Sequence, residues 1–559
     1  MTKIALRPPE QVMKLARIGA FHASRLSFMR VLLRNMAAEG WRFERRKFEI
    51  DAKGVGRAVY TAHGPRRAYS LVAFAHDLPD DMRSDRVIAT AWDATFCMFD
   101  GIPDETDLDR LAKNVPLQEA GRITSNELSL SRANRSVRLW AHVVESLAAG
   151  KQPDAKQIDA VGYLMRTTAV YGSGKFGAAD NAWLAPRTLT RAPFAVEMLS
   201  VYLTRSFIAD LVEHMAQQIS PKATTLDPAL RRKLGIGNST GLGMAPFLMN
   251  HPALLNAWVT ARETALARVR SLDSATPETI ARFNNLLARA QVNVANWRTD
   301  HSLQIGRIQG LSSGLARLVE HIAQGGLNGP QPWNSLYLWA ESALAIEAQE
   351  QLVSLMIEPH GELVDDLAAH MGADETACHM IDGAMTLAEL RAILEADYQW
   401  ALTPDYTERA ASARFWYVSE EKLEPRLGER FDEDGSALEQ PLATGRDIAA
   451  MSDALADIPG DTSLADFLLQ QPEHRHVVRR IQLAQTRPYS EVRDNLIAAD
   501  MLPIDLLRCK LSFFGAQKFD PRSDRWVRIC MFQNAPYPHE LTPETADDWA
   551  YPTLAGDLR

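Results

Sequence analysis

The chain has 559 residues, of which 46% are hydrophobic and 23% are charged. This composition excludes wholesale disorder and provides apolar residues for more than one core. The formal net charge is −9, which argues against general nucleic-acid binding. No apolar stretch approaches the roughly 20 residues that span a bilayer, and the N-terminus lacks the apolar core of a secretory signal. We therefore expect a cytoplasmic protein with no membrane partner.

The cysteines and histidines indicate neither a disulfide framework nor a metal site. No two cysteines form a Cys-x-x-Cys pair; the four are Cys97, Cys378, Cys509 and Cys530. Scattered cysteines are typical of reduced thiols, and no histidines have the spacing of zinc ligands. The sequence therefore predicts no bound metal, and it indicates no particular organic cofactor.

The N-terminal region changes its hydrophobic period. In residues 9–39, apolar side chains recur every three to five positions, which predicts one or two packing helices. In residues 41–100, aromatic and β-branched runs between turn residues predict a small antiparallel sheet. Near the C-terminus, the runs 510–515 and 525–532 flank a turn and predict a hairpin. We expect the hairpin to return to the N-terminal sheet, because an isolated hairpin is only marginally stable.

Helical periodicity dominates beyond residue 105. Helices are predicted at 131–149, 155–170, 194–218, 253–272, 277–295, 336–357 and 386–400. The expected fold class is therefore mainly α (α+β), a multi-helix bundle with a small antiparallel β-sheet near the N-terminus that the C-terminal hairpin completes. Breaks in the pattern, including the acidic stretch 426–445, indicate subdomain joints. The expected domains are 1–104 (helix and sheet), 105–425 (helical core) and 426–559 (acidic joint, helices and hairpin).

Residues 235–244 contain four glycines and three small hydrogen-bonding side chains, directly before a helix-prone run. A loop at the start of a helix binds anions through unpaired N–H groups and the positive end of the helix dipole. The segment therefore predicts a carboxylate- or phosphate-binding loop made by Asn238, Ser239, Thr240, Gly241 and Gly243. An ordinary helix cap with glycines at tight turns explains the same pattern.

A second glycine-rich segment, residues 171–177, places a lysine between glycines. It is not the phosphate-binding loop of nucleotide hydrolases, because Phe176 stands where that loop has Ser or Thr. We expect Ser173 to bind substrate and Lys175 and Tyr171 to supply acid/base chemistry. The alternative is a glycine that ends a helix beside a solvated lysine.

Two arginines are further candidates for substrate binding. Helix capping explains the Ser and Asn residues of 122–135 but not the excess of arginine there. Guanidinium groups bind carboxylate and phosphate in a bidentate geometry, so Arg132 and Arg166 are predicted to hold the substrate; surface ion pairs are the alternative. His76 next to Asp77 is only a weak sign of an acid/base pair, since adjacent strand residues point to opposite faces.

These patterns favour an enzyme that acts on a small anionic metabolite, a carboxylate or a phosphate, by lyase or transferase chemistry. One alternative is a non-catalytic helical binding or scaffold protein whose glycine-rich segments are tight turns. A second alternative is nucleic-acid binding through the basic residues of 1–50, which interspersed acidic residues and the lack of a known module argue against. The expected partner is a small anionic molecule, and a homo-oligomer is compatible with the sequence.

Overall fold

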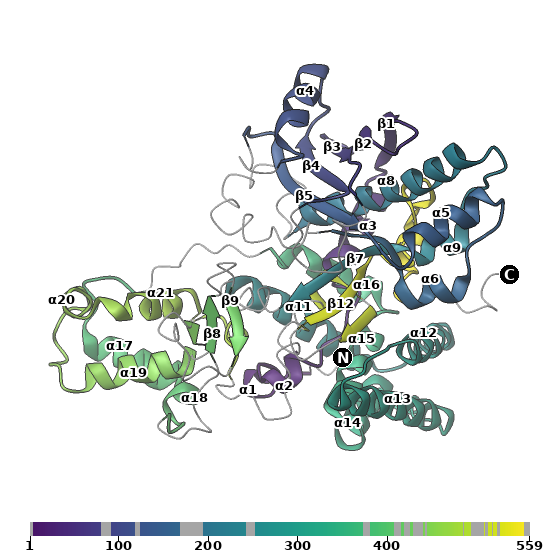
Figure 1. Ribbon diagram of the computed structural model, residues 1–559. Helices are drawn as coiled ribbons and strands as arrows, with labels where there is room; N and C mark the ends of the chain where they lie inside the picture. Colours follow the sequence, from purple (N-terminus) through teal and green to yellow (C-terminus); the bar gives the residue numbers. More distant parts are fainter. Residues whose placement is uncertain are drawn as a thin grey trace.

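A large, curled mixed sheet with helices packed around it dominates the computed structural model of the protein (Figure 1). The structure describes residues 4–79, 91–117, 123–167, 194–241, 252–372, 381–406, 415–418, 425–428, 440–441, 444–484, 486–493, 508, 512–516, 518–521 and 526–552. The strands of the large sheet are β1 (Arg42–Ile50), β2 (Gly56–His63), β3 (Ala68–Ala75), β4 (Ala94–Asp100), β5 (Glu127–Arg135), β6 (Tyr163–Thr167), β7 (Gly235–Gly241), β11 (Lys518–Pro521) and β12 (Trp526–Met531).

In these described ranges the strand order is β1-β2-β3-β4-β5-β6-β7-β12-β11. Neighbouring strands are antiparallel except β6 and β7, which run parallel. The expected fold class is therefore wrong, because the sheet is large and mixed and not a small antiparallel one. The error lies in β5 and β6, which occupy positions where helices were predicted. In β5, Ser129, Ser131 and Ala133 are buried and alternate with less buried residues. This is the period-2 pattern of a strand, but its Ser and Asn residues also match the pattern of helix capping.

The helices follow the predicted positions more closely. Those of the N-terminal half are α1 (Pro9–Val12), α2 (Leu15–Ile18), α3 (Phe28–Ala38), α4 (Glu105–Asn114), α5 (Trp140–Ala148), α6 (Ala155–Val161), α8 (Ala195–Ile219), α9 (Pro228–Lys233) and α11 (Pro252–Arg270). Those that follow are α12 (Pro277–Ala295), α13 (Ser302–Ala323), α14 (Pro332–Ala343), α15 (Ile346–Ile357), α16 (Gly361–Val364), α17 (Leu387–Asp397), α18 (Gln399–Leu402), α19 (Thr444–Ala456), α20 (Leu464–Gln470), α21 (Arg475–Ala484) and α23 (Pro543–Asp547). The predictions for α8, α11 and α12 are confirmed, whereas the predicted helix 336–357 is divided into α14 and α15. No described helix is both long and apolar enough to cross a bilayer.

Helix α8 covers one face of the sheet and α4 covers part of the other. The Phe207 ring of α8 lies edge-on to Phe96 of β4, with centroids 5.7 Å apart. Residues 195–209 of α8 are all buried, as expected for a helix that lies between layers. On the opposite face, Leu108 and Leu111 of α4 pack with Cys97. Adjacent residues of a strand point to opposite faces of the sheet. The even-numbered side chains of β4 therefore face α8, as Phe96 does, and the odd-numbered ones face α4, as Cys97 does.

The predicted C-terminal hairpin does join the large sheet. Strands β11 and β12 form it, and β12 pairs with β7, with Ile529 opposite Asn238. Its first strand lies later in the chain than expected, since residues 512–514 are helical. The hairpin therefore extends the sheet beyond β7, and it does not pair with the N-terminal strand β1.

Helices α17 to α21 have a hydrophobic cluster of their own, which includes Leu394, Ile448 and Ile481. Figure 1 shows these helices grouped at the left, away from the large sheet. A small sheet of β8 (Phe415–Val418), β9 (Pro425–Gly428) and β10 (Gln440–Pro441) lies beside them. The three-domain division stays a prediction, although this cluster takes residues from both sides of the expected 425/426 boundary.

A buried arginine–glutamate network attaches the N-terminal segment to α11 and α15. Its members are Arg7, Arg17, Arg262, Glu263 and Glu350. Glu350 accepts from all three guanidinium groups at 2.6 to 2.7 Å. Arg30 of α3 forms a further buried pair with Glu358 at 2.9 Å. Much of the positive charge that the sequence shows near the N-terminus is therefore inside the protein.

Candidate functional site

A polar strip crosses β4, β5 and β6 on the sheet face opposite α8. Thr95 pairs in register with Arg132, and Asn134 pairs with Arg166. Paired residues of neighbouring strands share a face, as do alternate residues of one strand. These four side chains, which we call the β5–β6 polar strip, therefore lie together. Thr95 is odd-numbered on β4, which assigns the strip to the α4 side of the sheet.

The two predicted substrate-binding arginines meet in this strip. Arg132 and Arg166 occupy diagonal positions on adjacent strands, which are typically about 7–8 Å apart. Both side chains are half-buried. The Arg132 guanidinium carbon lies 4.1 Å from the centroid of the Trp92 ring, a contact that restrains the plane of the guanidinium. Burial lowers the pKa of Arg132.

His76, at the end of β3, adds a titratable group beside the strip. Its Nε2 lies 2.9 Å from Oγ1 of Thr95. Burial lowers the pKa of His76, and the Asp93 carboxylate opposes this shift only in part. The imidazole is therefore neutral at pH 7 and suited to accept a proton. Sequence reasoning gave His76 little weight because its sequence neighbour is Asp77; the aspartate that acts on it comes from the start of the next strand.

Buried hydrogen bonds hold the start of β4 against the end of β5. Asp93 is fully buried, and its Oδ2 accepts from the Arg135 backbone N–H at 2.9 Å. The Asp93 backbone N–H donates to Oδ1 of Asn134 at 2.9 Å, and Nδ2 of Asn134 donates to the carbonyl of Ala91. Since Asn134 is a member of the strip, these bonds restrain the backbone on which the strip is built.

The prediction of a loop at 235–244 is wrong for residues 235–241, because these residues form strand β7. A Cβ on Gly237 would lie 2.6 Å from the Tyr163 ring, and one on Gly235 would lie 2.3 Å from the carbonyl oxygen of Met531. Glycine is required at these positions because neighbouring strands and side chains fill the space a side chain would need. For Gly235 and Gly237, close packing within the sheet therefore explains the pattern that resembled an anion-binding turn.

Asn238 is separated from the two arginines by the sheet itself. Gly237 pairs with Arg166 in register, so the next residue, Asn238, faces the α8 side. The Asn238 side chain is fully buried, and neither its oxygen nor its nitrogen has a hydrogen-bond partner among the described residues. A buried amide without partners costs of the order of 1–3 kcal/mol. Asn238 therefore stays a candidate ligand-binding residue, but not in the strip.

The remaining sequence-predicted residues lie at the end of β6 and β7 or in the segments that come after these two strands. Because β6 and β7 are parallel neighbours, Thr167 and Gly241 are at the same end of the sheet. The predicted residues outside the described part are Tyr171, Ser173, Lys175 and Gly243. Ser239 and Thr240 belong to β7, but their side chains are outside the described part. The binding and catalytic roles of all these residues stay predictions.

The comparisons with known proteins give no guide to the chemistry of the site. No family model, curated protein or solved structure matches this chain. Among the described residues, no three His, Cys, Asp or Glu side chains are grouped to hold a metal ion. Cys97 and Cys530 are buried free thiols. The groups that the strip and its neighbour His76 do supply, which are guanidinium, amide, hydroxyl and imidazole, are those that bind oxyanions and transfer protons.

Proposed function

We propose that the protein is a cytoplasmic enzyme that binds a small carboxylate- or phosphate-bearing metabolite at the β5–β6 polar strip. The observation that supports this most is the placement of Arg132 and Arg166 on one sheet face, with His76 beside them. Two half-buried guanidinium groups supply bidentate donors for one oxyanion. The substrate would thereby be held with its reacting carbon or oxygen near the imidazole.

A proton-transfer step follows from this arrangement. Neutral His76 would accept a proton from the substrate, and the two guanidinium groups would stabilise the negative charge that develops. Both lyase and transferase reactions include such a step, so both classes remain within the proposal. Tyr171 and Lys175 remain the proposed additional acid/base groups.

Two observations bear on the alternative functions. Nucleic-acid binding through the N-terminal segment is disfavoured because Arg7, Arg17 and Arg30 are buried against glutamates and are therefore not available to phosphate groups. A non-catalytic scaffold would explain the separate helical cluster of α17 to α21. It would not explain a histidine held neutral beside two arginines on the sheet, and we therefore favour the enzyme.

Replacing either arginine of the strip should weaken anion binding without unfolding the protein. We expect Arg132→Met and Arg166→Met each to lower the affinity for inorganic phosphate or a small carboxylate by about tenfold or more, because a charge-assisted hydrogen bond is worth about 1.5–3 kcal/mol. Calorimetric titration with phosphate, citrate and pyruvate measures this. Arg67→Met is the matched control. Arg67 lies just before β3, is half-exposed and forms an ion pair with Asp100, which ends β4. If both strip variants bind as the wild type does, the scaffold function is favoured instead.

The His76 side chain should titrate below the usual pKa of about 6.5. Protonation is disfavoured in the folded state, so the free energy of unfolding that depends on His76 falls as the pH drops below about 6.5. NMR titration of ring-labelled histidine, with His76→Gln to assign the signal, measures this pKa. A midpoint at or above 6.5 would contradict the role of His76 as a base that is neutral at pH 7.

A further inference from the structure

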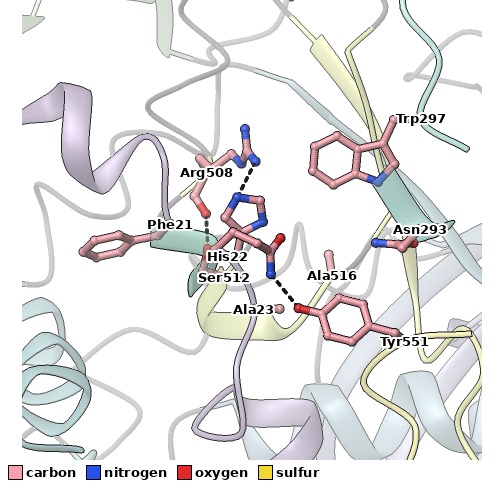
Figure 2. A pocket seen from close by; sticks show the side chains of 10 residues that line it. Phe21, His22, Ala23, Asn293, Trp297, Arg508, Ser512, Ala516 and Tyr551 are labelled. Carbon is pink, nitrogen blue, oxygen red and sulfur yellow. Dashed lines mark hydrogen bonds between the residues drawn. The ribbon is translucent and has the colours of Figure 1, made fainter. Parts of the chain in front are cut away.

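A second polar cavity lies outside the large sheet, and none of the residues lining it belongs to a strand. The space within it is about 350 Å³, a figure that includes the part open to solvent. The polar side chains that line it include His22, Asn293, Gln351, Arg508 and Tyr551, and Trp297 supplies an aromatic wall (Figure 2). They come from the segment between α2 and α3, from the end of α12, from α15 and from two C-terminal segments.

The hydrogen bonds of His22 define which of its nitrogens carries the proton. Nη2 of Arg508 lies 3.3 Å from Nε2 of His22 and donates to Glu347 at 2.7 Å. A guanidinium has no acceptor, so Nε2 must accept and Nδ1 must carry the proton. Burial and the positive charges of Arg508 and Arg262 lower the pKa of His22 well below its usual value, so the ring stays neutral. Its Nδ1–H has no hydrogen-bond partner among the described residues and is a donor available to a ligand.

Tyr551 supplies a second donor. Its hydroxyl oxygen accepts from Nε2 of Gln351 at 2.7 Å, so its single proton is left to donate elsewhere. Burial raises the pKa of Tyr551, which keeps this proton on the hydroxyl. Figure 2 shows the hydroxyl end of Tyr551 directed toward the part of the cavity where His22 lies. His22 and Tyr551 therefore each offer a donor to a ligand in the cavity.

The surroundings of the cavity also favour negative charge. The buried arginine–glutamate network has three guanidinium groups and two carboxylates, which leaves one positive charge. The guanidinium carbon of Arg262 lies 4.0 Å from the centroid of the Phe21 ring, and Phe21 also lines the cavity. The Arg508–Glu347 pair is neutral as a unit. The network therefore places a net positive charge one aromatic ring away, in an environment where screening by water is weak.

We propose that this cavity binds a small organic carboxylate. Its oxygens would accept from Nδ1–H of His22, from the Tyr551 hydroxyl and from the Arg508 guanidinium, and its carbon part would lie near Trp297. The site is distinct from the β5–β6 polar strip, because no residue is shared between them. A neutral molecule of the same shape would leave the positive charge of the network without a counterpart, so the cavity should select the charged form.

Calorimetric titration of the full-length protein with acetate and benzoate tests the proposal, with acetamide and benzamide as neutral molecules of matching shape. We expect at least one of the two carboxylates to bind and its amide not to bind. Tyr551→Phe keeps the ring and removes the donor, and it should weaken carboxylate binding by about tenfold or more. Tyr489→Phe is the matched control. This buried tyrosine lies outside the cavity and donates to the carbonyl of Arg7 at 2.6 Å, so loss of its hydroxyl should leave carboxylate binding unchanged.

The variants separate this cavity from the strip. Carboxylate binding that is lost in Arg132→Met and kept in Tyr551→Phe would place the ligand in the strip and overturn the present proposal. Equal binding of an amide and its carboxylate would overturn it as well, since the cavity would then not select charge. Absence of binding by both carboxylates at millimolar concentration would show a cavity that holds only solvent. Loss of binding in Tyr551→Phe alone would support the cavity even if the proposed function of the strip failed.

Discussion

Glu350→Gln is expected to destabilise the protein by about 3–5 kcal/mol, the cost of removing one member of a buried ion pair. The Glu350 carboxylate is fully buried and accepts from Arg7 at 2.7 Å and from Arg17 and Arg262 at 2.6 Å. Glutamine of the same shape removes the charge, so Arg7 and Arg262 would be left with Glu263 and Arg17 with the neutral Gln349. The loss should exceed that of an ordinary hydrogen bond, because the remaining positive charges stay desolvated. Urea unfolding followed by circular dichroism measures the change.

The control for this prediction is Glu341→Gln, which removes the same charge from an exposed position on α14 and should change stability by less than about 0.5 kcal/mol. Adding Arg17→Met to Glu350→Gln should recover part of the loss, since it removes one of the uncompensated charges. Equal stability of Glu350→Gln and the wild type would show that the network is not a determinant of folding.

The same carboxylate should make stability depend on acid. Although burial by itself raises the pKa of Glu350, the charges of Arg7, Arg262 and Arg17 outweigh it and lower this pKa well below the usual value. A carboxylate with a lowered folded-state pKa contributes stability above its unfolded pKa of about 4.3, and this contribution is lost as the pH falls further. The wild type should therefore lose more stability than Glu350→Gln between neutral pH and about pH 3.

Gly235→Ala is the second substitution with a large expected effect, a loss at the upper end of the range of about 1–3 kcal/mol for overpacking. The added Cβ would lie 2.3 Å from the carbonyl oxygen of Met531 and 2.7 Å from Sγ of Cys530. A side chain can rotate away from such a clash, but a strand carbonyl cannot move without displacing its neighbour. Thermal unfolding of the variant should therefore show a clearly lower midpoint.

Gly306→Ala is the matched control, because a Cβ on this glycine of α13 would meet no atom within 4 Å. Alanine has the higher helix propensity, so this variant should be more stable by about 0.5–1 kcal/mol. If Gly235→Ala were as stable as the wild type, the packing explanation for the glycines of β7 would be wrong, and a ligand-contacting role for the segment would regain support.

Local signals were enough to predict several helices. Helix α12 begins at Pro277 after Thr276, whose hydroxyl accepts the backbone N–H of Thr279 at 3.1 Å. A capping threonine followed by proline is a start signal that operates within a few residues. Helices α8 and α11 were predicted for the same kind of reason, because their apolar pattern is continuous over many turns. Such elements need no information about distant parts of the chain.

The strip was predicted in its residue types but not in its geometry. Arg132 and Arg166 were identified from their chemistry alone, on segments expected to be helical. Their proximity arises from pairing of β5 with β6, which depends on residues far apart in the chain. The link between His76 and Asp93 also depends on the pairing of β3 with β4. Period and composition do not reveal which strands pair, so these relations could not be read from one sequence.

The sequence by itself determined helices α8, α11 and α12, the presence of strands at 41–100 and the choice of the two arginines, because these depend on side-chain type and local spacing. The tertiary structure alone decided that the strands form one large mixed sheet and that Gly235 and Gly237 of β7 serve close packing. It also decided that Arg7, Arg17 and Arg262 face glutamates inside the protein. Each of these results depends on which distant residues meet, since burial and charge pairing are set by contacts across the fold and not by neighbours along the chain.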